Sequence, residues 1–269
     1  MHTPNYDQRF AGIARLYGRE AQALLARAHF LVIGLGGVGS WAAEALARSG
    51  IAELTLVDLD EVCVSNTNRQ SHALSSALGR AKTDVVAERL RDINPELNVH
   101  VVQDFLTKHN MREVIAPGVN VVIDAMDSVH VKTALVAYCS AIKLRLICVG
   151  SSGGKRDPRL ITVADLANTE SDPMLAKIRQ QLFRIYKFSR DTGRKFRVDA
   201  VYSTEHRRYP KPDGSVCTDK SVLSGGTKLD CASGFGASVM VTGSFGFVAA
   251  AQAIERYLSD QQNPERATD

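Results

Sequence analysis

The sequence predicts an α/β protein built on a doubly wound, mainly parallel sheet that antiparallel strands extend. Between residues 30 and 149, short runs rich in Val, Ile and Leu alternate with helix-forming segments. Continuous apolar runs of this kind are typical of strands whose two faces are both covered by helices. After Gly150, two runs show alternating apolar and polar residues, which is typical of antiparallel strands with one solvent-exposed face.

The expected elements follow one another in strand–helix order. Apolar runs predict parallel strands at residues 30–33, 54–58, 99–102, 119–124 and 145–149. Helix-forming segments between them predict helices at residues 40–49, 82–93, 110–115 and 131–141. Beyond Gly150 we expect strands at residues 159–165 and 196–202, a helix at residues 172–188 between them, and a last helix within residues 232–254.

A glycine cluster lies between the first strand and the first helix of this series. Gly34, Gly36 and Gly39 fit the pattern G-x-G-x-x-G, and Gly37 belongs to the same cluster. Glycines in such a turn let backbone N–H groups approach phosphate oxygens, and the following helix directs its positive end to the same point. Asp58, 19 residues past Gly39, is placed to accept hydrogen bonds from ribose. The pattern predicts a Rossmann-like nucleotide site; a tight turn without a ligand is the alternative.

Charged residues near the ends of the next strands favour ATP chemistry over hydride transfer. Asn66 and Arg69 follow the second strand, and Lys82 begins the next helix. Fixed cations suit a triphosphate under attack, because they stabilise charge on the leaving pyrophosphate. Asp127 follows the strand at residues 119–124, and a carboxylate there suits Mg²⁺ bound to phosphates. Taken singly, Arg69 and Lys82 have surface charges as their alternative, and Asp127 has a helix N-cap.

We expect one domain at residues 1–269, with an N-terminal arm (1–27), a nucleotide-binding half (28–150), and a β-rich extension with a basic lobe and closing helix (151–269). Residues 232–254 carry no charge, but Gly, Ala, Ser and Thr dominate the first part, which favours a buried helix over a membrane span. Five cysteines without a C-x-x-C pair, and an N-terminus without a signal-peptide core, indicate a reducing, cytoplasmic setting.

Residues 177–211 form a basic stretch. Eleven lysines and arginines stand against three acidic residues, a formal charge of +8, while the whole chain carries +4. Aromatic residues are interleaved with them, among them Tyr186, Phe188, Phe196, Tyr202 and Tyr209. Basic groups that follow phosphates and aromatic rings that stack on bases suit a single-stranded RNA loop. The alternative is an ordinary solvated helix face.

The motifs taken together resemble a known superfamily, the ubiquitin-activating-type adenylating enzymes, and the resemblance covers nearly the whole chain. The motifs that carry it are Gly34-x-Gly36-Gly37-x-Gly39, Asp58-x-Asp60, Ser65-Asn66-x-x-Arg69, Lys82, Ile93-Asn94-Pro95 and Asp124-x-x-Asp127. The resemblance implies that Asp58 holds ribose, that Asn66, Arg69 and Lys82 hold phosphates, and that Asp127 holds Mg²⁺. The resemblance also implies that Asp60 belongs to the nucleotide site.

Within that superfamily, other segments resemble a branch that cyclises threonylcarbamoyladenosine in tRNA. They are Arg15-Leu16-Tyr17-Gly18 and residues 40–48, 66–70 and 230–236. This resemblance implies ATP with Mg²⁺, tRNA as partner, and a homodimer in which an N-terminal arginine, Arg9 or Arg15, reaches the partner's ATP. The resemblance does not decide whether a monovalent cation is bound, or whether a sulfur-relay or cysteine desulfurase protein is a further partner.

Two other functions remain open from the sequence. The chain could adenylate the C-terminus of a small ubiquitin-like or sulfur-carrier protein, or it could be a nucleotide-binding oxidoreductase. Enzymes that adenylate small carrier proteins often have two C-x-x-C pairs that hold zinc, and this sequence has no such pair. Cys231, before the last predicted helix, is a candidate nucleophile, because a helix N-terminus lowers a thiol pKa. A small residue packed at a helix start is the alternative.

Overall fold

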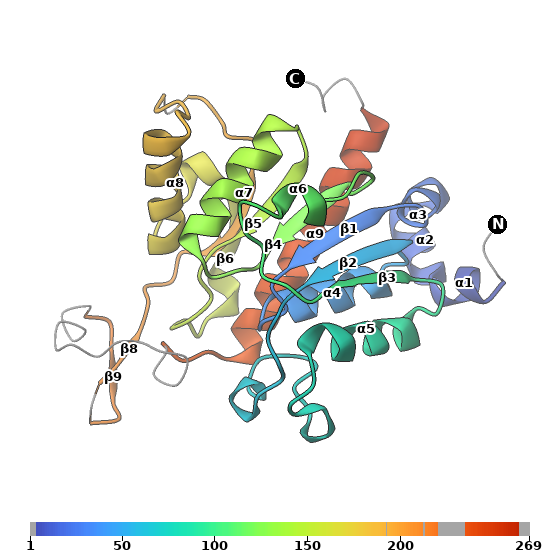
Figure 1. Cartoon of the computed structure of the whole chain (residues 1–269), viewed down its shortest axis with the longest axis horizontal. Helices are drawn as coiled ribbons and strands as arrows, with labels where there is room; N and C mark the ends of the chain where they lie inside the picture. Colours follow the sequence, from blue (N-terminus) through green and yellow to red (C-terminus); the bar gives the residue numbers. More distant parts are fainter. Residues whose placement is uncertain (1–3, 192, 212, 220–234, 264–269) are drawn as a thin grey trace.

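The computed structural model describes residues 4–191, 193–211, 213–219 and 235–263 (Figure 1). A seven-stranded sheet in the order β3-β2-β1-β4-β5-β7-β6 forms the centre of this part of the chain. Six of its strands are parallel, and β6 runs antiparallel to β7. The strands are β1 (His29–Ile33), β2 (Glu53–Val57), β3 (Asn98–Val102), β4 (Val121–Asp124), β5 (Arg145–Val149), β6 (Ile161–Asp165) and β7 (Asp199–Ser203).

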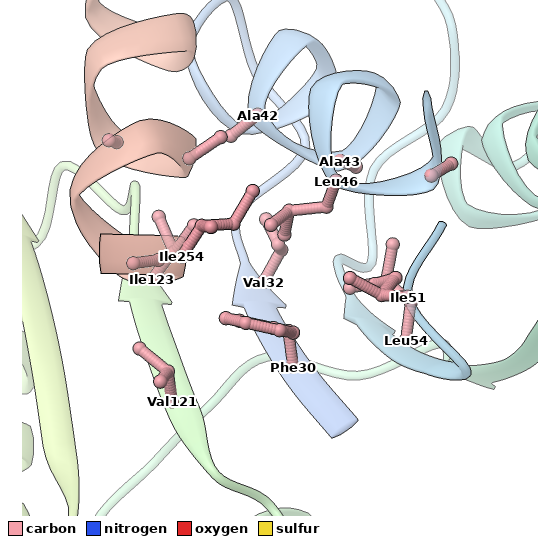
Figure 2. Close-up of a cluster of buried hydrophobic side chains, with 14 of the residues drawn as sticks. Phe30, Val32, Ala42, Ala43, Leu46, Ile51, Leu54, Val121, Ile123 and Ile254 are labelled. Carbon is pink, nitrogen blue, oxygen red and sulfur yellow. The ribbon is translucent and has the colours of Figure 1, made fainter. Parts of the chain in front are cut away.

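Helices cover both faces of the sheet (Figure 1). One face carries α3 (Arg19–Leu25), α4 (Gly39–Arg48), α5 (Lys82–Ile93) and α9 (Val239–Gln262). The other carries α6 (Met111–Val114), α7 (Val129–Ala141) and α8 (Pro173–Ile185). Because side chains alternate along a strand, Phe30 and Val32 pack on the first face, while Leu31 and Ile33 pack on the second. The sheet thus has two hydrophobic layers, and the first is shown in Figure 2.

The last helix packs directly on the helix that follows the glycine cluster. A Cβ on Gly246 of α9 would lie 2.6 Å from the carbonyl oxygen of Val38, so the two backbones approach closely only because this residue is glycine. Trp41 of α4 meets Phe247 edge-on, with ring centroids 5.8 Å apart. The prediction of a buried helix is confirmed for the described residues of this segment. None of the described helices has the length and hydropathy that crossing a bilayer requires.

The N-terminal arm packs on the main body. It forms three short helices, α1 (Pro4–Arg9), α2 (Ala11–Tyr17) and α3. Tyr6 and Phe10 are buried, and Gly50 leaves the space that their rings occupy. At the other end of the arm, the hydroxyl of Tyr257 in α9 donates a hydrogen bond to the carbonyl oxygen of Leu24 (3.0 Å).

The predicted strands and helices before Gly150 are confirmed, with ends shifted by up to two residues. The prediction of one solvent-exposed face is wrong for residues 196–202. The strand there, β7, lies between β5 and β6, and four of its five residues are buried. Asp199, which suggested a wet face, accepts hydrogen bonds from Arg256 and Gln252 of α9. The short hairpin of β8 (Tyr209–Pro210) and β9 (Val216–Cys217) was not predicted.

Candidate active site

The glycine turn of residues 34–39 joins β1 to α4 at the carboxyl edge of the sheet. Gly34 has a φ of +87°, and a Cβ on it would lie 3.0 Å from the carbonyl oxygen of Ala125. A Cβ on Gly39 would lie 1.8 Å from the carbonyl oxygen of Gly34, so no larger residue fits unless the backbone moves. A Cβ on Gly36 would meet no atom of the described residues within 4 Å. The turn is therefore closed on its inner side and open at Gly36, where a phosphate group can approach.

Asp58 connects this turn to the loop after β2. Its Oδ2 accepts a hydrogen bond from the backbone N–H of Leu35 (2.6 Å), and its Oδ1 accepts one from the N–H of Asp60 (2.9 Å). Each carboxylate oxygen keeps a second lone pair for another donor. The predicted ribose ligand therefore also has a structural role, because it holds the turn and the next strand end together.

Lys82 lies at the first position of α5, and its side chain is 6% exposed. Its Nζ lies 2.7 Å from Oδ2 of Asp60 and 3.9 Å from Oδ1 of Asp58. The sequence pattern suggested a cation directed at a phosphate. The structure brings the lysine to the predicted edge, but pairs its charge with these two carboxylates.

Arg69 lies against the glycine turn. A Cβ on Gly37 would be 3.1 Å from the Cγ of Arg69, and Nε1 of Trp41 donates a hydrogen bond to the Arg69 carbonyl oxygen (2.9 Å). The guanidinium donates to the carbonyl oxygen of Ser65 (2.8 Å) and to Oδ1 of Asn68 (3.0 Å). Arg69 as a whole is half-buried and lies against Gly37, and its role as a phosphate ligand stays a prediction.

Asn66 has a more local role than predicted. Its side chain is buried, and its Oδ1 accepts a hydrogen bond from the N–H of Cys63 (3.1 Å) in the short 3₁₀ turn Val64–Asn66. This contact fixes the loop that carries Arg69. The observed bond is therefore to the loop's own backbone.

Sequence reasoning missed a group of buried polar side chains next to Lys82. His72 is 1% exposed, and in the described part of the chain neither of its ring nitrogens has a hydrogen-bond partner. Oε1 of Gln70 and Oγ1 of Thr83 are likewise buried without a partner among those residues. Burial, together with the charge of Lys82, lowers the pKa of His72 to about 4, so the imidazole is neutral at pH 7. No local pattern marks these residues, because only the fold buries them.

The two aspartates after β4 have different surroundings. Asp124 is fully buried, and its Oδ1 lies 2.8 Å from Nζ of Lys132, which is also fully buried. Burial raises the pKa of Asp124, although the lysine opposes this effect. Asp127 is exposed and has no hydrogen bond or ion pair within the residues that the structure describes. The N-cap of α7 is Ser128, so the alternative interpretation of Asp127 as that cap is wrong.

The two candidate arginines of the N-terminal arm also differ. Arg9 donates a hydrogen bond from Nη1 to the carbonyl oxygen of Ile93 in its own chain (2.9 Å). Arg15 is exposed on α2, and no hydrogen bond or ion pair engages it within residues 4–191 or the other described segments. Arg15 is therefore the freer of the two to reach another molecule.

The basic stretch of residues 177–211 is not a separate lobe, because it runs through α8 and β7 of the main body. Its exposed basic residues are Lys177, Arg184, Lys187, Arg190, Arg194, Lys195 and Arg197. Others have structural partners: Arg207 lies over the ring of Phe235, with its Cζ 4.2 Å from the centroid. The interpretation of all five aromatic residues as stacking surfaces is wrong, since three of them are buried: Phe196, Tyr202 and Tyr209.

The loop at residues 151–154 borders the same edge from the other half. Lys155 is buried, donates to the carbonyl oxygen of Ser203 (3.1 Å) and lies 3.9 Å from the buried carboxylate of Asp172. The N–H of Gly154 donates to the carbonyl oxygen of Gly236 (2.9 Å). Cys231, the candidate nucleophile, lies outside the described residues.

The edge as a whole offers what a nucleoside triphosphate needs. Gly36 is open among the described residues, Arg69 lies against the turn, and Asp127 is an exposed carboxylate; groups of these kinds suit phosphate oxygens and a phosphate-bound cation.

Comparison with known proteins agrees with this geometry. The tRNA threonylcarbamoyladenosine dehydratase of Escherichia coli K12 is 52% identical over 254 residues, which are 94% of this chain and 95% of that protein. The Haemophilus influenzae protein of the same name is 46% identical over the same shares of the two chains. The crystal structure of the E. coli enzyme, TcdA, in complex with ATP superposes with a TM-score of 0.86 at 45% identity, covering 97% of this chain and 98% of that one. Residues 6–267 match the ThiF family, and the chain therefore belongs to that family.

Proposed function

We propose that this protein is an ATP-dependent dehydratase that cyclises threonylcarbamoyladenosine in tRNA. The observation that carries the proposal is the 52% identity to the E. coli dehydratase over almost the full length of both chains. The site supports it independently, because the glycine turn, Arg69 and Asp127 gather at one sheet edge. The proposal treats residues 1–269 as a single adenylating domain.

The chemistry explains why such a reaction needs ATP. The substrate has a free carboxylate, and ring closure must expel one of its oxygens, which is a very poor leaving group. If the carboxylate attacks the α-phosphate of ATP, pyrophosphate leaves and the oxygen becomes part of an acyl-AMP. An atom of the neighbouring carbamoyl group then attacks the acyl carbon and expels AMP. The second step is intramolecular, so orientation alone can contribute on the order of 7–11 kcal/mol.

In this proposal the chain's residues act mainly by binding and positioning. The N–H groups of the glycine turn and the guanidinium of Arg69 hold phosphate oxygens and stabilise the charge that develops on the pyrophosphate. Asp58 accepts a hydrogen bond from ribose with its remaining lone pairs. Lys82 can turn from Asp60 towards phosphate when ATP brings a greater negative charge to the edge.

A divalent cation fits the same site. Asp127 provides one exposed carboxylate, which no described residue pairs with, and Mg²⁺ typically binds through one or two carboxylates plus substrate phosphates. Such an ion would neutralise charge on the phosphates. Asp124 cannot serve as a second ligand, because Lys132 occupies it in the core.

The proposal includes a homodimer in the cytoplasm, with Arg15 rather than Arg9 crossing to the partner's ATP. The support is that Arg9 is bonded to its own chain, whereas Arg15 is exposed. The exposed basic residues of α8 and the loop after it would contact tRNA phosphates. A sulfur-relay protein as a further partner and a bound monovalent cation stay part of the hypothesis, as does a covalent role for Cys231.

Mass spectrometry of nucleosides tests the proposal. tRNA that carries threonylcarbamoyladenosine is incubated with the protein, ATP and Mg²⁺, digested and analysed. We expect the nucleoside to lose one water, with AMP formed in equal amount, only when ATP is present. Cys231→Ala separates direct cyclisation from a covalent route, since only the latter requires the thiol.

The same assay separates the competing function. No change in the nucleoside, together with pyrophosphate exchange stimulated by a small protein that ends in Gly-Gly, would assign the chain to protein adenylation. No ATP consumption under either condition would exclude both functions.

A further inference from the structure

A second cluster of chemically active side chains lies at the amino-terminal edge of the sheet, opposite the glycine turn. His29 and Glu53 are the first residues of β1 and β2, and they are paired in the parallel register. His100 of β3 is paired with Thr55, two residues beyond Glu53. Because side chains two apart share a face of a strand, all three groups lie on the same face of three neighbouring strands.

The atoms that could bind a metal are close together. Nε2 of His100 lies 3.0 Å from Oε2 of Glu53, and Nδ1 of His29 lies 4.0 Å from the same oxygen. One ligand atom from each of the three residues lies within 4.8 Å of those of the other two. Ligands about 2.0–2.2 Å from a tetrahedral zinc ion stand roughly 3.3 Å apart, so small side-chain rotations complete the geometry.

Neighbouring groups orient the ligands. Nε2 of His29 is hydrogen-bonded to Oγ1 of Thr55 (2.8 Å), which turns Nδ1 towards Glu53. The backbone N–H of His29 donates to Oδ1 of Asn120 (2.8 Å), which fixes the start of the strand. A second hydrogen bond on the ring of a ligating histidine is the usual way in which proteins set its orientation.

A hollow of about 630 Å³ opens onto the cluster, between the sheet and the segment that follows α6. Its charged lining residues are Arg27, Glu53, Asp104 and Glu113, so carboxylates outnumber the single guanidinium. The hollow admits water as a fourth ligand, and its charge favours a cation. His29 is largely buried, with 13% of its side chain exposed, while Glu53 and His100 are 43% and 45% exposed.

We propose that His29, Glu53 and His100 bind one divalent transition-metal ion, with zinc as the best match. Two imidazoles and one carboxylate suit zinc and similar metals, whereas Mg²⁺ and Ca²⁺ prefer oxygen ligands alone. The ion would link β1, β2 and the edge strand β3, and so stabilise the sheet at the end remote from the nucleotide. The inference is independent of the proposed reaction.

Calorimetric titration with ZnCl₂ tests the site directly, using chelator-treated, tag-free protein in a buffer with excess Mg²⁺. We expect one Zn²⁺ per chain and a rise in the melting temperature with zinc concentration. His100→Ala and Glu53→Gln should each weaken binding by at least about tenfold, since loss of an outer-shell partner alone costs that much. His130→Ala, which removes an exposed histidine of α7, is the matched control and should bind zinc as the wild type does.

A second readout separates this site from binding to thiols elsewhere. Co²⁺ bound to two nitrogens, one oxygen and water should give a visible spectrum without a thiolate charge-transfer band. Thr55→Val leaves all three ligands in place and should weaken binding by about tenfold, through loss of the bond to His29. Equal zinc affinity in the wild type, His100→Ala and Glu53→Gln, or no saturable binding by the wild type, would overturn the proposal.

Discussion

The glycine turn and the basic stretch differ in how firmly the structure determines what each residue does. At the turn, backbone atoms approach so closely that Gly34 and Gly39 admit no side chain, and Asp58 is held by two backbone donors. The basic stretch of residues 177–211 was recognised from its charge. In the structure, some of its basic side chains are exposed, while others, such as Arg207, pack on neighbouring residues. Geometric constraint is therefore the stronger guide to function, and four experiments test this comparison.

The largest effect is expected at the turn itself. Gly39→Ala places a methyl group 1.8 Å from the Gly34 carbonyl oxygen, so the turn must rearrange. We expect the protein to lose several degrees in melting temperature or fail to fold, and to lose ATP binding. Gly36→Ala, where the added Cβ meets no atom of the described residues within 4 Å, should keep the wild-type melting temperature. Equal thermal stability of the two variants would show that the turn is not constrained as described.

The next effect concerns the free carboxylate. Asp127→Ala should lower the rate of ATP-dependent dehydration on the order of 10²-fold, because a group that acts on the charged phosphates is lost. The melting temperature should not change, since Asp127 is exposed and has no hydrogen bond or ion pair in the described part of the chain. Asp92→Ala, at another exposed aspartate, serves as the control and should be fully active. Unchanged activity of Asp127→Ala would remove this residue from the site.

A third experiment measures how the buried imidazole of His72 changes the free energy of unfolding as the pH falls. His72 has a folded-state pKa of about 4, below its ordinary value of 6.5, so the unfolded chain binds the extra proton first. Stability should therefore fall as pH drops from 6.5 to 4, by up to about 3 kcal/mol, and this loss should level off below pH 4. Denaturant unfolding across this range checks it. His72→Met should flatten that slope; an unchanged slope would assign it to other groups.

The smallest effect is expected in the basic stretch. Arg184 and Lys195 are exposed, and replacing both by Ala should weaken tRNA binding and reduce the slope of log K against log salt concentration by about 1.4. Lys108 and Arg112, exposed near α6, form the matched double control, with an expected unchanged slope. Filter binding at several salt concentrations measures both. If the two double variants behave alike, the stretch is only a solvated surface.

The sequence predicted what short-range patterns encode. Apolar runs located β1 to β5, and the glycine spacing located the turn, because both depend on neighbouring residues. β7 was misjudged because the polar residue Asp199 finds its partners on α9, more than 50 positions away. The group of His29, Glu53 and His100 could not be foreseen either, since only strand register brings them together. The sequence also does not show which of the two aspartates after β4 is accessible. The structure shows that Asp124 is buried and that Asp127 is exposed.

The contact between Gly246 and Val38 has a consequence for the timing of folding during synthesis. The glycine turn and α4 leave the ribosome early, but α9, which supports them, is the last of the described helices to be made. Asn68, next to Arg69, likewise waits for the start of α9, where it bonds to Ala237 and Val239. Since domains generally complete folding as units, a nascent chain cannot complete the glycine turn and its support until α9 has been synthesised. Premature stop codons should therefore yield fragments that neither fold stably nor sequester nucleotide.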